Sequence, residues 1–209
     1  MSPVALTFDD GPHPQWTPAV LDALAEASVT ATFFIQGDRL LARPGLARAT
    51  VAEGHSVQAH CDRHRSHHQL SKAEITADLD RLLHAMRTAG LPRPSFWRPP
   101  YGDIAAPRSQ EVAAGHGLRL VTWTVESCDW ARDSAAAIFS ELLAERRPAT
   151  RLEPDSIILM HDSVGAHTAE LVHLLAAEIR NRGWTCGPIS RAARTPERPF
   201  NACQPSSGG

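Results

Sequence analysis

Lysine is almost missing from this chain of 209 residues: Lys72 is the only one, and arginine supplies the rest of the 21 basic residues. The 23 acidic residues leave a formal net charge of −2. Without a basic excess, the composition gives no support for a nucleic-acid partner or for binding to an anionic membrane surface. We therefore expect neither kind of partner.

Long apolar runs are missing as well. No stretch approaches the roughly 18 apolar residues that indicate a membrane span, and the first residues have none of the features of an export leader. We expect no membrane span. The location stays open: it is cytoplasmic if the chain never had a leader, and secreted if a leader has been trimmed.

The four cysteines form neither a CxxC pair nor a dense framework. This pattern favours a reducing compartment or free thiols over a disulfide scaffold. The cysteines are Cys61, Cys128, Cys186 and Cys203.

Apolar runs typical of strands alternate with segments of helical periodicity. About seven strand–helix units indicate a parallel sheet with helical crossovers in one α/β domain, residues 1–190, and we expect a monomer. The expected strands are Val4–Phe8, Thr32–Ile35, His55–Ala59, Ser95–Trp97, Leu118–Val125, Ser156–Met160 and Trp184–Ile189. The expected helices are Thr17–Ala27, Leu46–Glu53, 71–88 with a capping box at Ser71 and Glu74, Arg108–Ala114, 134–146 and Thr168–Arg182. Residues 191–209 have almost no apolar periodicity and should form a flexible tail.

Polar side chains follow five of these strands at the point where each strand ends. In a parallel barrel, catalytic groups gather at the carboxyl ends of the strands. Five loops should therefore converge on one cleft. They carry Asp9 and Asp10, His60 and His64, Arg98 and Tyr101, Asp129 and Trp130, and His161.

Two histidines four residues apart, His60 and His64, face the same way if their segment makes a helical turn. The spacing alone fits solvated histidines in a histidine-rich loop better than a metal site. A carboxylate from another loop, Asp9 or Asp10, would complete a set of two histidines and one carboxylate with open positions for water and substrate. These donors suit Zn²⁺, with Co²⁺, Ni²⁺ or Fe²⁺ as alternatives.

Adjacent carboxylates on an extended strand end point in opposite directions, so Asp9 and Asp10 need not do the same job. One can bind an ion while the other acts as a general base beside it. On its own, Asp-Asp-Gly-Pro also fits an ordinary turn. A hydrolase also needs a proton donor, and His161 has the side chain that carries a proton near neutral pH, with Asp129 on a neighbouring loop to hold it charged.

The segment Arg98-Pro99-Pro100-Tyr101-Gly102 has a stiff backbone with a guanidinium at its start. Arg98 can clamp Asp9 through a bidentate contact and keep it ionised. The backbone N–H groups of Tyr101 and Gly102 can face a developing oxyanion. A structural loop with a surface arginine explains the same residues equally well.

In order and approximate spacing, these motifs resemble those of the polysaccharide deacetylases, the NodB-homology group or carbohydrate esterase family 4. The likeness spans roughly residues 4–190. The motifs are Thr7-Phe8-Asp9-Asp10-Gly11, His60-x-x-x-His64, Arg98-Pro99-Pro100-Tyr101-Gly102, Asp129-Trp130 and Leu159-Met160-His161. The resemblance implies a distorted (β/α)7 barrel. It also implies metal-dependent removal of acetyl groups from N-acetylated amino sugars such as chitooligosaccharides or peptidoglycan.

The resemblance also implies a role for each motif residue. Asp9 would be the base, and the ion would be held by Asp10, His60 and His64. Arg98 would orient Asp9, the Tyr101 amide would support the oxyanion, and His161 would be the acid, tethered by Asp129. Substrate-pocket residues would be Trp123, Trp130 and Leu159, with Trp123 and Leu159 accepting the acetyl methyl group.

Four positions depart from the family pattern without removing a ligand, base or acid. They are Ala59 in place of Asn, Cys61 in place of Ser or Thr, Arg65 in place of Pro, and Glu126 in place of Asp. They leave the sugar and the metal open. Three other functions fit parts of the pattern: an O-acetyl esterase acting on xylan, a sugar-binding pseudoenzyme without turnover, and a non-haem iron oxygenase.

Overall fold

The computed structural model of the chain describes residues 3–104, 107–144 and 151–190. Its strands are β1 Ala5–Gly11, β2 Thr32–Gln36, β3 Ser56–Cys61, β4 Phe96–Trp97, β5 Arg119–Leu120, β6 Val125–Glu126 and β7 Ile157–His161. Its α-helices are α1 Trp16–Ala27, α2 Gly37–Ala42, α3 Pro44–Ala52, α4 Lys72–Thr88, α5 Pro107–His116, α6 Ala135–Leu143 and α7 His167–Asn181. Short 3₁₀ turns occur at η1 His67–Gln69, η2 Pro100–Gly102 and η3 Asp129–Ala131.

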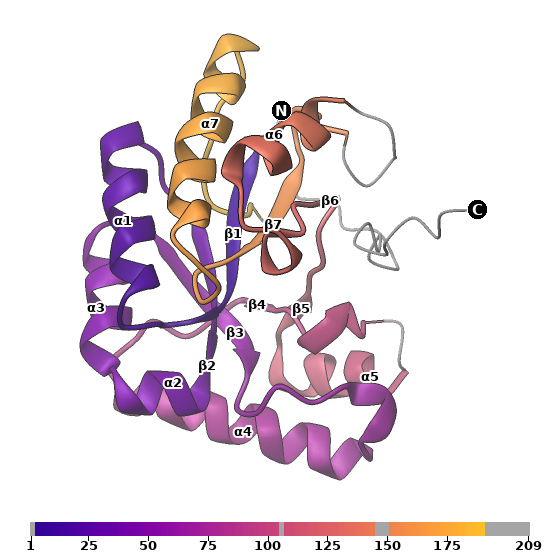
Figure 1. Cartoon of the computed structure of the whole chain (residues 1–209). Coiled ribbons are helices and arrows are strands. Elements are labelled where there is room, and N and C mark those ends of the chain that lie inside the picture. Colours follow the sequence, from indigo (N-terminus) through magenta and orange to yellow (C-terminus); the bar gives the residue numbers. More distant parts are fainter. Residues whose placement is uncertain (1–2, 105–106, 145–150, 191–209) are drawn as a thin grey trace.

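The seven strands are parallel and form one curled sheet in the order β5-β4-β3-β2-β1-β7-β6. The helices cover its outer side, with α1 beside α7 and α4 beside α5 (Figure 1). The strands β5 and β6 are the two edges of the sheet. This is the distorted (β/α)7 barrel that the family resemblance implies.

The alternation of side chains along β1 divides the core into two layers. Leu6 and Phe8 belong to the large apolar cluster between the sheet and the helices, whereas Ala5 belongs to a smaller cluster with Phe34 and Trp123. Because side chains alternate along a strand, Thr7 and Asp9 share the face of Ala5. Asp9 therefore comes to the carboxyl end of β1 on the side of the smaller cluster.

Local signals in the sequence account for most of the element boundaries. The capping box at the start of α4 is present: the Ser71 side chain accepts a hydrogen bond from the Glu74 N–H, and the Glu74 side chain accepts from the Ser71 N–H. Two expectations are wrong, and one helix is additional. The segment Leu118–Val125 forms two short strands, β5 and β6, rather than one. The segment Trp184–Ile189 contributes only an isolated bridge at Cys186 to Val4, and α2 was not expected.

One of the cysteines differs from expectation. Cys61 and Cys186 are free, but Cys128 is disulfide-bonded. Every other cysteine is far from Cys128 in the sequence, and spacing rules do not detect such a pairing.

Within the described ranges, no helix has the length and apolar character to cross a membrane. The expected tail, residues 191–209, and the expected end of the helix 134–146 lie outside the described residues.

Candidate active site

Two β-bulges deliver the candidate metal ligands. The β1–β2 pairing passes from Asp9 opposite Phe34 to Gly11 opposite Ile35, so Asp10 is the extra residue. The β2–β3 pairing likewise skips His60. An extra residue in one strand re-aims its side chain. Asp10 also has a φ of 71°, in the left-handed region that is uncommon for residues other than glycine.

The two bulges bring Asp10 and His60 together with His64. Asp10 Oδ1 lies 3.2 Å from His60 Nε2 and 3.5 Å from His64 Nε2, and one donor atom from each residue lies within 4.8 Å of the others. One carboxylate oxygen and two imidazole nitrogens are a donor set that suits a divalent transition metal.

The tautomer of His60 is the one that a metal ligand needs. Its Nδ1 lies 2.6 Å from the carbonyl oxygen of Arg98, which can only accept a hydrogen bond, so Nδ1 carries the proton. In the neutral ring, Nε2 then keeps its lone pair. Nε2 is buried and has no hydrogen-bond partner of acceptable geometry. A buried, unpartnered nitrogen that faces a carboxylate and a second imidazole fits a metal ligand.

The charges around the ligands favour an ionised Asp10. Burial raises the pKa of Asp10, but the neighbouring His60 imidazole, with the charges of His161 and His64, lowers it well below its usual range. Burial lowers the pKa of His64. An ionised carboxylate and a neutral His64 are the states in which these groups bind a metal ion.

A fully buried arginine holds the second carboxylate. Arg98 Nη1 donates to Asp9 Oδ1 at 2.7 Å and to Thr7 Oγ1 at 2.8 Å, and Nη2 donates to the Thr122 carbonyl at 3.0 Å. The guanidinium also lies over the Phe34 ring, 4.1 Å from its centroid. The contact with Asp9 therefore uses one nitrogen and is not bidentate as the sequence suggested. Thr7 is a partner that the sequence reasoning missed.

His161 lies on the other side of Asp9, since the two residues are partners in the β1–β7 pairing. Its Nδ1 donates to Asp129 Oδ1 at 2.8 Å, and its backbone N–H donates to Asp129 Oδ2 at 2.7 Å. Thr168 Oγ1 donates to the same Oδ2 at 3.1 Å. Burial disfavours a charge on His161, but the charge and hydrogen bond of Asp129, with the charges of Asp9 and Asp10, raise its pKa to about 9. His161 is thus protonated at neutral pH.

The aromatic candidates separate into two groups. Tyr101 and Trp130 are 62 % and 54 % exposed, and the His64 ring packs edge-on against Tyr101 with centroids 4.7 Å apart. Trp123 and Leu159 are buried in the smaller cluster with Phe34. The Tyr101 backbone has a φ of 59° inside η2, which breaks the helical turn at that residue.

Comparisons with known proteins show the family of the chain. The family model described as polysaccharide deacetylase matches residues 2–121. The chain belongs to the polysaccharide deacetylase family. It is an enzyme, a deacetylase.

Two curated relatives and one solved structure illustrate the likeness. A chitooligosaccharide deacetylase from a Bradyrhizobium species is 40 % identical over 166 residues, which cover 76 % of this chain and 70 % of the relative. A bifunctional xylanase/xylan deacetylase from Cellvibrio japonicus is 33 % identical over 187 residues, which cover 89 % of this chain and 27 % of the relative. A family 4 carbohydrate esterase from Streptomyces lividans, solved with acetate, superposes with a TM-score of 0.83 at 33 % identity, covering 95 % of this chain and 98 % of that one.

Two further acidic residues fix the loops of this deacetylase, and the sequence reasoning missed both. Asp78, on α4, accepts hydrogen bonds from the backbone N–H groups of Asp62 and Arg63, between the two histidines. Asp103 accepts from Ser66 Oγ and from the N–H of His67. Asp78 is one of the polar residues of an amphipathic helix, and most such side chains only contact solvent. The sequence of the helix therefore does not distinguish Asp78 from its polar neighbours.

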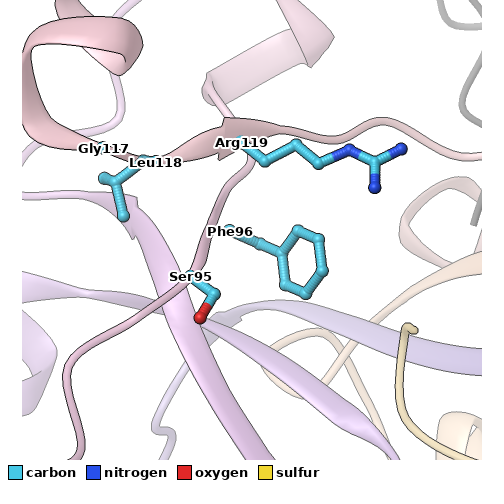
Figure 2. A pocket seen from close by; sticks show the side chains of 5 residues that line it. All are labelled: Ser95, Phe96, Gly117, Leu118 and Arg119. Carbon is cyan, nitrogen blue, oxygen red and sulfur yellow. The ribbon is translucent and has the colours of Figure 1, made fainter. Parts of the chain in front are cut away.

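Two cavities in the described part of the chain lie away from these residues. One, of about 320 Å³, is lined by Ser95, Phe96, Gly117, Leu118 and Arg119. These residues stand at the start of β4 and β5, and Figure 2 shows Phe96 and Arg119 extending side by side from the two strands. The other, of about 550 Å³, follows the end of α4 and includes Met86, Arg87 and Leu91. Because the strands are parallel, the first cavity is at the opposite end of the sheet from the site.

Proposed function

We propose that this deacetylase removes acetyl groups from N-acetylated amino sugars in a reaction that depends on a divalent metal ion, with zinc as the preferred ion. Asp10, His60 and His64 hold the ion. The observation that carries the proposal is that His60 Nε2 is buried, has no hydrogen-bond partner and lies 3.2 Å from Oδ1 of Asp10, the residue that follows Asp9. When bound, the ion would polarise the acetyl carbonyl and lower the pKa of a water molecule.

The residues around the ion divide the proton transfers between them. Asp9 takes the proton of the attacking water, and Arg98 keeps its carboxylate oriented. His161, held protonated by Asp129, gives a proton to the departing amine, so that acetate and a free amino sugar result. The backbone N–H of Tyr101 faces the developing oxyanion.

The remaining assignments concern the substrate. Trp123 and Leu159 would border the space for the acetyl methyl group. Both are apolar and belong to the smaller cluster, on the face of the sheet that Asp9 shares. Trp130 and Tyr101 are exposed aromatic residues suited to contact a sugar ring. Relatives named for chitooligosaccharide support an N-acetylglucosamine oligomer as the substrate class.

A second candidate is removal of O-acetyl groups from xylan, favoured by the relative from Cellvibrio japonicus. The two reactions share the attack on an acetyl carbonyl but differ in the leaving group, an amine or an alcohol. A screen of chitooligosaccharides, peptidoglycan fragments and acetylated xylan with zinc-loaded protein separates them. Acetate with an equal amount of free amine supports the first reaction, and acetate from xylan alone supports the second.

Two variants test the residue roles. Asp9→Asn should bind zinc normally and lose about 10²–10⁴-fold in rate, the usual contribution of a general base. His60→Ala should lose both zinc and activity. Full zinc occupancy in His60→Ala would overturn the ligand assignment, and no acetate from any of the three substrates would overturn the proposed activity.

A further inference from the structure

The candidate ligand Asp10 is held by residues outside the motifs discussed so far. It is the extra residue of a bulge and has a left-handed backbone. A non-glycine residue in that region keeps its conformation only where the surroundings impose it. The structure must therefore contain groups that fix the backbone of Asp10, and a metal ligand also needs a fixed carboxylate.

Gln36 fixes the carboxylate. It is the last residue of β2, the strand between β1 and β3, so it lies between the bulge at Asp10 and the bulge at His60. Its side-chain Nε2 donates to Asp10 Oδ1 at 2.8 Å, and the residue is only 6 % exposed. The same oxygen is the one that faces the Nε2 atoms of His60 and His64.

Arg39 fixes the backbone. The helix α2 follows β2 without an intervening loop, which brings Arg39 close to the end of β1. Its Nη1 donates to the main-chain oxygen of Asp10 at 2.7 Å. One corner of the fold, the β2–α2 junction, thus contacts both the side chain and the main chain of a single residue.

We propose that Gln36 and Arg39 are positioning residues that set the divalent-cation affinity of this site by holding Asp10 in its ligand conformation. The inference rests on the proposed function, in which Asp10 is a ligand. A carboxylate oxygen has two lone pairs, so Oδ1 can accept from Gln36 and still bind an ion. The amide of Gln36 carries no charge, so it holds Asp10 without neutralising the negative charge of the carboxylate that attracts the cation.

The test for Gln36 is the zinc dissociation constant of Gln36→Met, measured by competition with a chromogenic chelator. Methionine keeps the length of the side chain and removes the donor. We expect zinc binding about 10–100-fold weaker, the usual effect of losing a hydrogen bond to a metal ligand. The matched control is Gln58→Met: Gln58 is also a nearly buried glutamine, on the neighbouring strand β3, but it accepts from the N–H groups of Ser95 and Phe96. This control should bind zinc as the wild type does.

The test for Arg39 separates positioning from charge. Removing a positive charge near a cation site should tighten cation binding if only electrostatics matters. Removing a group that holds Asp10 should weaken it. We expect Arg39→Met to weaken zinc binding, and Arg43→Met, which removes the same charge from the end of α2, not to weaken it. Arg39 is partly exposed, so this variant should fold even if Gln36→Met does not.

The outcomes separate this inference from the proposed function. Wild-type zinc affinity in Gln36→Met, or wild-type or tighter affinity in Arg39→Met, would overturn the positioning role even if His60→Ala loses zinc. Zinc retained in His60→Ala would instead overturn the metal site itself. Melting temperatures of the metal-free variants, measured by circular dichroism, show whether a loss of affinity accompanies a loss of folding.

Discussion

The protonation state of His161 is the feature most directly open to measurement. The substitution Asp129→Asn removes the negative charge that favours the protonated ring. In the wild type, the Asp129 carboxylate accepts from His161 Nδ1 and from its backbone N–H. The variant keeps the size of the side chain but removes the negative charge. The largest interaction that favours the charged ring is then lost, so the pKa of His161 should fall from about 9 towards its ordinary value of 6.5.

The size of the effect follows from the two pKa values. The difference corresponds to about 3 kcal/mol in favour of the protonated ring. An acid acts only in its protonated form, so activity falls as the pH rises through the pKa of His161. At pH 8, the protonated fraction would drop from about nine-tenths to about 3 %, a loss of about 30-fold in rate. At pH 6 both proteins keep most of their protonated form, so the charge effect should nearly vanish.

The assay is the pH profile of kcat/KM for acetate release from an N-acetylated oligosaccharide by the zinc-loaded protein. The matched control is Thr168→Val, which removes one hydrogen bond to Asp129 Oδ2 but keeps the carboxylate. The pH at which kcat/KM of this control falls to half on the alkaline side should stay near 9. Equal slowing by Asp129→Asn from pH 6 to pH 9 would refute the predicted pKa shift, because that result would mean that Asp129 orients the ring without holding its charge.

Three further changes test other parts of the argument. His161→Ala should keep zinc and slow acetamide substrates more than activated acetate esters, whose leaving groups need no proton; equal slowing in rate assays with both substrates would argue against an acid role. Gly11→Ala should destabilise the fold by about 1–3 kcal/mol in denaturant titrations, since its Cβ would lie 2.7 Å from Asp162 Cγ. The control Gly45→Ala, in helix α3, meets no atom within 4 Å and should not destabilise the fold. Ser71→Ala removes the cap of α4 and should cost about 1 kcal/mol of stability with unchanged kcat.

The fold was largely predictable because its signals are local. Alternating apolar runs and helix caps are properties of short segments, and a parallel sheet follows from the alternation of strands and helices. The errors occur where local signals fail. The apolar segment Leu118–Val125 looks like one strand, but its two ends pair with different neighbours: β5 with β4, and β6 with β7. Only tertiary structure can divide such a segment between the two edges of a sheet.

That these side chains lie close together was predictable for a similar reason. The carboxyl-terminal end of each strand can be recognised in the sequence, and parallel strands bring all of these ends to the same face of the barrel. What the sequence did not reveal is how each side chain is held. Gln36 and Asp78 look like an ordinary strand end and an ordinary helix surface, and their role depends on distances to Asp10 and to the 62–63 backbone.

The two bulges explain why the geometry cannot be deduced from the order of residues alone. In a regular strand, Asp9 and Asp10 would point to opposite faces, and only one of them could reach the site from inside the sheet. The extra residue at Asp10 allows both carboxylates to act at the same end, one against Arg98 and one against His60 and His64. Separate roles for adjacent residues therefore require a local irregularity, and the groups that stabilise it, Gln36 and Arg39, become part of the site although they carry no chemistry of their own.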